Sequence, residues 1–108
     1  MKISRNGKKV TVIGTGNVGA TVAFILSMNG TCHEVMLRSR NIDVAKGKAL
    51  DMSQAANAAR QHTIVQAAQE PSDISDSDIV VITAGAPRTP GMSRDDLLLT
   101  NANIVKTY

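Results

Sequence analysis

The sequence predicts an α/β domain built on a parallel sheet, and three observations support this class. Short β-branched runs alternate with longer amphipathic stretches along the 108 residues. Strands that are joined through helices in this way pair in parallel. Apolar residues make up 43% of the chain, yet Phe24 and Tyr108 are its only aromatic residues. The interior must therefore consist of aliphatic side chains, which suits buried parallel strands flanked by helices.

The first half of the chain is predicted to contain two strands and two helices. Residues 9–14 are a β-branched run that ends in glycine, which is typical of a buried strand. Residues 17–29 are apolar on most faces and stop at Asn29-Gly30, so they predict a helix packed on a sheet. Residues 34–37 predict the second strand, and residues 43 to about 60 predict a long amphipathic helix. The apolar stripe of that helix comprises Ala45, Ala49, Met52, Ala56 and Ala59.

The second half is predicted to add two strands and a helix. Residues 62–66 favour a third strand, residues 71–76 a polar connection with one helical turn, and residues 78–83 a fourth strand. The loop at 84–92 contains two prolines and two glycines. A helix follows, because Ser93 and Asp96 have the spacing of a capping box and Asp95 adds negative charge at its positive end. With about four strands, residues 9–108 are expected to form a doubly wound parallel sheet.

Composition and charge disfavour several classes of function. The net charge is +3, but stacking aromatics and long basic runs are missing, which disfavours nucleic-acid binding. Residues 1–8 are expected to be a solvated basic leader, carrying Lys2, Arg5 and Lys8 next to Lys9. No apolar run has the length of a membrane span or the character of a signal peptide. The single Cys32 favours a reducing compartment, so we expect a soluble, cytoplasmic protein without membrane contact.

Residues 14–19 have the pattern G-x-G-x-x-G between a predicted strand and a predicted helix. In this context Gly14 permits a tight turn, Gly16 lets the backbone approach a pyrophosphate, and Gly19 allows the helix to pack closely on the strand. Free N–H groups of the first helical turn would face the anion. The pattern predicts a Rossmann-type sheet that binds a dinucleotide; the alternative is a tight turn without a ligand. The predicted cofactor-binding residues are Gly14, Thr15, Gly16, Asn17, Val18 and Gly19.

The stretch Arg38-Ser39-Arg40 stands where this fingerprint usually has an acidic residue. That acid lies about 20 residues after the last glycine and accepts hydrogen bonds from the adenosine ribose, and Ser39 occupies its position. A carboxylate would repel a 2′-phosphate, whereas arginines beside a hydroxyl group would attract one. The stretch therefore favours NADP over NAD. The alternative is that both arginines are solvated and that Ser39 or Asn41 binds an ordinary ribose.

Two arginines and an asparagine follow the fourth predicted strand. Ligands of doubly wound sheets bind beyond the carboxyl ends of the strands, which places Arg88 on the functional rim. Arg94 opens the next helix, and Asn101 follows on the same face about 10 Å along the axis. One helix face can thus present a cation and an amide to a ligand. The alternative is that Arg88 and Arg94 are ordinary surface arginines.

Three motifs, in this order, are similar to those of the lactate/malate dehydrogenase family. They are Val-Ile-Gly-Thr-Gly-Asn-Val-Gly at 12–19, Lys-Gly-Lys-Ala-Leu-Asp-Met at 46–52, and residues 79–94 running into Asn-Ala-Asn-Ile-Val-Lys at 101–106. The resemblance extends from about Lys9 to Tyr108, and it implies that residues 9–108 are the N-terminal part of a dinucleotide-binding (Rossmann) domain, truncated after about four strands. It implies hydride transfer between a nicotinamide cofactor, NADP or NAD, and a 2-hydroxy or 2-keto acid.

The resemblance implies a role for single residues. Arg88 resembles the loop residue that chooses the substrate, an arginine for a dicarboxylate such as oxaloacetate and a glutamine for pyruvate. Arg94 matches the arginine that closes over the site and polarises the substrate carbonyl. Asn101 matches a cofactor-contacting asparagine, whereas Ser39 departs from the family's ribose-binding acid. A malate-specific enzyme is therefore expected, with a lactate-type or other 2-hydroxyacid dehydrogenase, or a non-catalytic dinucleotide-binding or oligomerisation fragment, as alternatives.

Other parts of the family's machinery have no match in this sequence. The catalytic histidine, its aspartate partner and the arginine that anchors the substrate carboxylate come from later in the family's chains, so the catalytic domain is expected to be absent here. His33 and His62 lie near strand starts, at the opposite end of the sheet, and are expected to be structural or surface residues. No Cys, His, Asp or Glu spacing suggests a metal. The resemblance also implies that the intact protein is a homo-oligomer.

Overall fold

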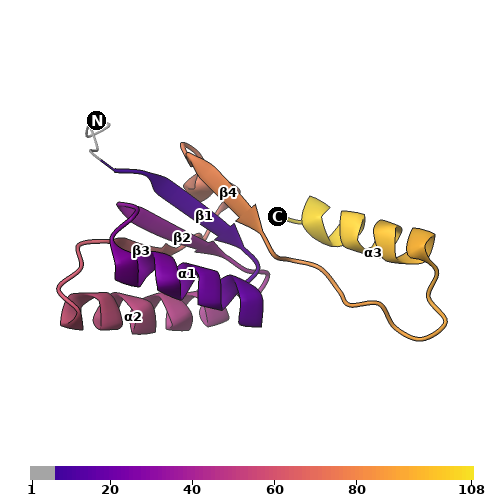
Figure 1. Cartoon of the computed structure of the whole chain (residues 1–108). Helices are drawn as coiled ribbons and strands as arrows, with labels where there is room; N and C mark the ends of the chain where they lie inside the picture. The colour runs from indigo at the N-terminus through magenta and orange to yellow at the C-terminus, as the bar shows by residue number, and fades with distance from the viewer. Residues whose placement is uncertain (1–6) are drawn as a thin grey trace.

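A computed structural model describes residues 7–108, which form one four-stranded sheet with helices (Figure 1). The strands are β1 (Lys9–Ile13), β2 (Glu34–Arg38), β3 (Ile64–Ala67) and β4 (Ile79–Ile82). The helices are α1 (Asn17–Asn29), α2 (Ile42–Ala58) and α3 (Arg94–Lys106), with a short 3-10 helix η1 (Pro71–Ile74). Lys2 and Arg5 of the predicted leader lie outside the described residues.

Neighbouring strands of the sheet all pair in parallel, in the order β3-β2-β1-β4. Helix α1 connects β1 to β2, and α2 connects β2 to β3. The register aligns Ile13 at the end of β1 with Arg38 of β2 and Ile82 of β4. The segments that leave these three strands therefore meet at one carboxyl edge. The predicted α/β class and Rossmann-type parallel sheet are confirmed.

Helices α1 and α2 lie side by side on one face of the sheet (Figure 1). Their buried residues are mostly small, which lets both helices approach the strands closely. These residues are Gly19, Ala23 and Ser27 in α1 and Ala45, Ala49, Met52 and Ala56 in α2. Ala23, Ala45, Ala49 and Met52 pack with aliphatic side chains from the strands, namely Val10, Val12, Val35, Leu37 and Val65.

The long helix α2 begins and ends near the predicted positions. It starts at Ile42, one residue earlier than predicted, because the side chain of Asn41 caps it. It ends at Ala58, and Arg60 then adopts a left-handed φ of 59°. Ala59 was expected to lie in the buried stripe, but it follows the last helical residue and is exposed.

The opposite face of β1 is fastened to the segment around η1. The Nζ atom of Lys9 donates to the carbonyl oxygens of Asp73, at 2.7 Å, and of Ser75, at 2.9 Å. The Thr11 hydroxyl lies 2.5 Å from that of Ser77. Because alternate residues of a strand point to opposite faces, Lys9 and Thr11 lie away from α1 and α2. Lys9 is only 8% exposed, so the expectation that it joins a solvated leader is wrong.

The third strand begins two residues later than predicted. Its ladder starts at Ile64, whose N–H donates to the carbonyl of His33 at 2.8 Å. Thr63 is buried, but its hydroxyl donates to the carbonyl of Cys32 at 2.8 Å, and His62 is exposed. The β-branched pattern did not distinguish this side-chain contact from a ladder position.

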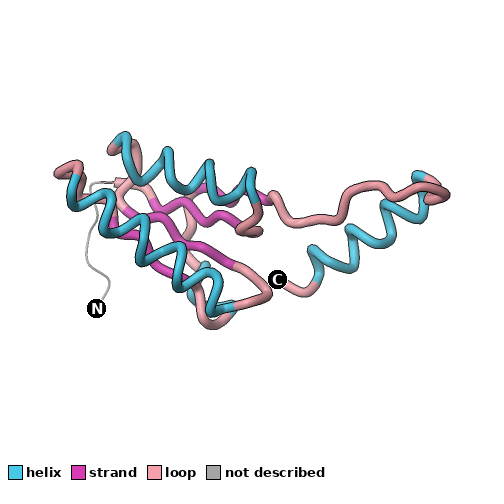
Figure 2. The backbone as a smooth tube through the Cα atoms, turned by 90° about the horizontal axis from the view of Figure 1, so that it is seen from below, coloured by secondary structure: helices cyan, strands magenta, loops and turns pink. Residues whose placement is uncertain are grey.

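Beyond β4 the chain leaves the sheet. Loop 83–93 extends outward and α3 runs back, so that the C-terminus comes close to the carboxyl edge (Figures 1 and 2). Helix α3 has no buried residue. The predicted capping box at its start is confirmed, since the Asp96 N–H donates to Ser93 Oγ at 3.0 Å and the Ser93 N–H donates to Asp96 Oδ2 at 3.2 Å. None of the helices within residues 7–108 has the length and apolar character to cross a bilayer.

Candidate functional site

The glycine turn between β1 and α1 forms the floor of the candidate site. Gly14 has a φ of +100°, a value that residues with a side chain rarely adopt. Its N–H donates to the carbonyl of Arg38 at 2.8 Å. A Cβ atom on Gly14 would lie 2.7 Å from the backbone nitrogen of Ala84. The turn therefore requires glycine here, and it brings together the ends of β1, β2 and β4.

The two following glycines have very different surroundings. A Cβ on Gly19 would lie 2.0 Å from the Gly14 carbonyl oxygen, so α1 packs tightly against the turn. A Cβ on Gly16 would meet no atom within 4 Å. Gly16 is also the N-cap of α1, and no side chain caps the helix there. The first N–H groups and the positive end of the helix dipole are therefore available to an anion, so these residues fit a dinucleotide phosphate.

Two side chains that the sequence analysis did not single out hold the turn. The Thr83 hydroxyl, just after β4, donates to the carbonyl of Gly14 at 3.1 Å. Lys48 of α2 donates from Nζ to the carbonyl of Thr15. The position of Thr83 at the end of a predicted strand could have indicated its role, since that end belongs to the functional edge. Lys48 stands in one of the family motifs, but nothing in its helical spacing indicates that it reaches the turn.

A cavity of about 330 Å³ opens at this carboxyl edge. Five of the predicted cofactor residues line it, namely Gly14, Thr15, Gly16, Ser39 and Arg40. The other lining residues are Asn41, Thr83, Ala84, Gly85, Ile104 and Tyr108. Of the remaining predicted residues, Asn17, Val18 and Gly19 open α1, and neither Arg38 nor Asn101 lines the cavity. The cavity thus joins the glycine turn to the position expected to bind the adenosine ribose.

The two arginines beside Ser39 lie in different places. Strand β2 continues through Arg38, one residue further than predicted, and its alternation turns Arg38 away from the face of Leu37. Arg38 acts electrostatically on Asp73 of η1, and its Nε is buried without a hydrogen-bond partner among residues 7–108. Arg40 follows the strand, is exposed and lines the cavity. Arg40 and Ser39, without Arg38, therefore face the candidate adenosine site.

Asn101, a predicted cofactor residue, and Asn41, the alternative ribose ligand, are both engaged in contacts within the chain. The Oδ1 atom of Asn41 accepts from the N–H groups of Asp43, at 3.1 Å, and Val44, at 3.3 Å. The Oδ1 atom of Asn101 accepts from the N–H of Ala86 at 2.6 Å. The first contact caps α2, and the second joins α3 to the loop after β4. Both amide oxygens are thus structural in this conformation.

The predicted substrate residues stand apart from the dinucleotide cavity. Arg88 is exposed and donates from Nε to the carbonyl of Met92 at 3.0 Å, within the loop itself. It lines a separate open cavity of about 620 Å³ formed by residues 88–93. Arg94 is exposed at the start of α3. Neither Arg88, in the middle of loop 83–93, nor Arg94, at the start of α3, lines the cavity at the glycine turn.

Both histidines lie at the opposite end of the sheet, as predicted. His33 and His62 line a cavity of about 350 Å³ together with Cys32 and the segments near the strand starts. Cys32 is buried and free, and its burial raises the pKa of the thiol. Among residues 7–108, His, Cys, Asp and Glu side chains form no group of three that could hold a metal ion.

Comparisons with known proteins point to one family. Residues 8–108 match the family model described as lactate/malate dehydrogenase, NAD binding domain. A malate dehydrogenase of Sulfurimonas denitrificans is 67% identical over 100 residues, which are 93% of this chain and 31% of that protein. The chain thus spans about a third of the length of the curated relatives it matches.

Solved structures agree with this result. The malate dehydrogenase of Cryptosporidium parvum superposes with a TM-score of 0.81 at 35% identity, over 93% of this chain and 32% of that one. The minor L-lactate dehydrogenase of Enterococcus mundtii, solved in a ligand-bound form, superposes with a TM-score of 0.83 at 31% identity, over 95% of this chain and 32% of that one. The backbone alone therefore does not distinguish malate from lactate enzymes.

Proposed function

This chain belongs to the lactate/malate dehydrogenase family, whose NAD-binding domain it matches over residues 8–108, and from this premise we propose that it is the dinucleotide-binding part of a malate dehydrogenase. The bound nicotinamide cofactor would supply or accept the hydride that interconverts malate and oxaloacetate. The glycine turn and the start of α1 bind its pyrophosphate, through the open space at Gly16 and the uncapped helix end.

The exposed side chain of Arg88, in the loop after β4, favours a dicarboxylate substrate. It stands at the family's substrate-selecting position in a loop that leaves the carboxyl edge, and its side chain is exposed. The second carboxylate of oxaloacetate needs a cation there, whereas the methyl group of pyruvate does not. Arg94, at the start of α3, polarises the substrate carbonyl when the loop closes. A lactate-type or other 2-hydroxyacid dehydrogenase is disfavoured by Arg88.

Ser39 and Arg40 favour NADP as the preferred cofactor. Both line the cavity beside the glycine turn, where an acidic residue would repel a 2′-phosphate. Arg38 supports this preference less directly, since its side chain lies on the η1 side of the sheet.

The remaining steps of catalysis require groups beyond those described. His33 and His62 lie at the other end of the sheet, so we assign the proton donor and the arginine that anchors the substrate carboxylate to a separate catalytic domain.

We also propose that the intact enzyme is a cytoplasmic homo-oligomer. The only cysteine is a free thiol, which favours a reducing compartment. Helix α1 exposes the apolar side chains of Phe24 and Ile25, which favours an interface between subunits. Size-exclusion chromatography with light scattering tests the oligomeric state.

A substrate comparison tests the proposed activity. In the intact enzyme, kcat/KM for oxaloacetate should exceed that for pyruvate by about 100-fold or more. Pyruvate lacks the second carboxylate that pairs with Arg88 in the closed site. The absorbance of the reduced nicotinamide reports both reactions. Preference for pyruvate would establish the lactate-type alternative, and cofactor binding without turnover of either acid would indicate a non-catalytic dinucleotide-binding or oligomerisation module.

A further inference from the structure

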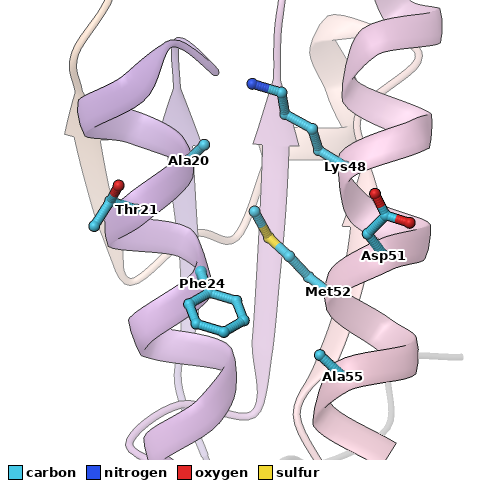
Figure 3. Close-up of a pocket in the computed structure, with 7 residues that line it drawn as sticks. All are labelled: Ala20, Thr21, Phe24, Lys48, Asp51, Met52 and Ala55. Atoms are coloured by element: carbon cyan, nitrogen blue, oxygen red, sulfur yellow. The ribbon is translucent and has the colours of Figure 1, made fainter.

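Lys48 connects helix α2 to the glycine turn, although the two are far apart in sequence. Its Nζ donates to the carbonyl oxygen of Thr15, thirty-three positions earlier in the chain. Figure 3 shows the Lys48 side chain extending from α2 toward α1 at one end of the groove between the two helices, which is also lined by Ala20, Thr21, Phe24, Asp51, Met52 and Ala55. Thr15 is buried and lines the dinucleotide cavity. The ammonium group of Lys48 thus contacts the backbone of the candidate cofactor site without lining its cavity.

This contact fixes the orientation of one peptide group. In a trans peptide the carbonyl and the following N–H point in opposite directions, so holding the oxygen of Thr15 toward α2 turns the N–H of Gly16 away from α2. Thr15 and Gly16 both line the cavity. The preceding peptide is held from another side, since the Thr83 hydroxyl donates to the Gly14 carbonyl at 3.1 Å. Two neighbouring carbonyls of the turn are therefore each held by a side chain from a different element.

The turn needs such support because it lacks support of its own. Gly14 and Gly16 have no side chains to limit rotation of the backbone, and α1 has no side-chain cap at Gly16. A turn with this freedom loses conformational entropy when it closes around a ligand. A hydrogen bond from a charged donor to one of its carbonyls reduces that loss before the ligand arrives.

We propose that Lys48 is a positioning residue of the dinucleotide site, which presets the Thr15–Gly16 peptide for a pyrophosphate through its hydrogen bond to Thr15. The role rests on the dinucleotide binding proposed above. It requires no contact between Lys48 and the ligand. Lys48 should therefore affect ligands that carry a pyrophosphate and leave adenosine binding unchanged.

The test compares Lys48→Met with Lys46→Met. Lys46 belongs to the same helix and carries the same charge, but it is exposed and does not line the groove. Isothermal titration of the full chain with ADP-ribose should show the dissociation constant of Lys48→Met raised about five- to tenfold, the effect of one charge-assisted hydrogen bond. The constant of Lys46→Met should stay within about twofold, as expected of an exposed charge. Adenosine, measured by competition, should bind both variants like the wild type.

Salt and a conservative variant separate positioning from simple attraction. Because the hydrogen bond is partly buried, the effect of Lys48→Met should persist when salt is raised to about 0.5 M, whereas long-range attraction would be screened. Lys48→Arg should restore most of the affinity, since its guanidinium can also donate to the carbonyl. Should Lys48→Met fail to fold, Lys48→Ala carries the same comparison, because alanine also lacks a donor for the Thr15 carbonyl.

Several results would overturn the proposal. Equal losses in Lys46→Met and Lys48→Met, or equal losses for adenosine and ADP-ribose, would assign the effect to net charge or to general stability. Unchanged ADP-ribose binding in Lys48→Met would remove the role of Lys48 while leaving dinucleotide binding intact. A wild-type protein that binds no ADP-ribose would instead contradict the proposed function, and the role of Lys48 with it.

Discussion

At the scale of single residues, the sequence predicts some positions of the proposed site better than others. The requirement for glycine at Gly14 and Gly19 is local, because turn geometry and close packing follow from the strand, turn and helix order. The place of Arg38 is not local. It depends on whether β2 ends at Leu37 or one residue later, and that single step moves the side chain to the other face.

Asn101 illustrates the same difficulty across a longer distance. Its spacing from Arg94 predicts a ligand-facing amide, but the loop after β4 places Ala86 beside it and takes up its oxygen at 2.6 Å. Lys48 is a similar case, because a helical pattern does not say which distant carbonyl its ammonium group reaches. Contacts between elements of this kind depend on the packed structure rather than on the pattern of the sequence.

Substrate choice should depend on Arg88. In the intact enzyme, Arg88→Gln should lower kcat/KM for oxaloacetate by about 10²–10⁴-fold, the loss of a charge-paired contact of about 3–5 kcal/mol in a closed site. Pyruvate reduction should fall far less, since pyruvate has no second carboxylate. Steady-state kinetics with both acids measures the two effects. Equal losses for both substrates would contradict the assignment of Arg88 as the selecting residue.

Cofactor choice should depend on Ser39 together with Arg40. At low salt the protein should bind NADP at least about tenfold more tightly than NAD, a difference of about 1.4 kcal/mol. The gap should shrink as salt rises, because Arg40 is exposed. Ser39→Asp should reverse the order by adding a ribose acceptor and a repulsive charge. Titration of both proteins with both nucleotides measures this, and a wild type that prefers NAD would show that Arg40 is only a solvated residue after the strand.

At the scale of elements, the two glycines at the start of α1 should affect different properties, Gly19 the stability of the fold and Gly16 the binding of the dinucleotide. Gly19→Ala should lower the free energy of unfolding by about 2 kcal/mol or more, because its Cβ would lie 2.0 Å from the Gly14 carbonyl oxygen. Gly16→Ala should change stability by less than about 1 kcal/mol, since its Cβ meets no atom, but should weaken dinucleotide binding by blocking the phosphate. Urea unfolding and nucleotide titration of both variants test the pair. A Gly16→Ala protein that still binds the dinucleotide normally would place the phosphate elsewhere.

Asp73 of the 3-10 helix η1 should make the free energy of unfolding depend on pH in the acid range. Hydrogen bonds from the N–H groups of Glu70 and Gln69 lower the pKa of Asp73, with smaller contributions from the charges of Lys9 and Arg38. Since the pKa is lower in the folded state, the stabilisation is present above the ordinary pKa of about 4 and is lost as pH falls through the folded value.

Asp73→Asn isolates this effect. The variant should be less stable than the wild type near pH 7. The difference should shrink as pH falls from about 4 through the lower folded-state pKa, because the Asp73 carboxyl is protonated first in the unfolded state and then in the folded state. Urea unfolding at several pH values gives both curves. Parallel curves through the acid range would show that Asp73 does not contribute to the acid dependence of stability.

At the scale of the whole molecule, the described residues leave large apolar surfaces uncovered. The order β3-β2-β1-β4 makes β4 an edge strand, and Ile79, Val80 and Ile82 are each about half exposed. Helix α3 likewise exposes Leu98 and Leu99. The alternation of strands and helices predicts the sheet and its parallel order, since both follow from local pattern and the crossover rule. What covers β4 and α3 does not follow from these 108 residues, because such contacts involve partners that the local pattern does not describe.

The 108-residue chain on its own should therefore bind dinucleotides weakly, oxidise no measurable malate and associate through β4. It has the glycine turn and the arginine loop, but its histidines lie at the wrong end of the sheet, and general acid–base catalysis alone is worth about 10²–10⁴-fold. An unpaired apolar edge strand is prone to pair with another chain. Nicotinamide absorbance measures turnover by the purified chain, and size-exclusion chromatography measures its association.

Val80→Lys should reduce association by placing a charge on the edge strand, whereas Gln66→Lys on β3, at the opposite edge, serves as the matched control. Sustained turnover by a monomer would mean that His33 or His62 reaches the substrate, and the assignment of the proton donor to a separate domain would then be wrong.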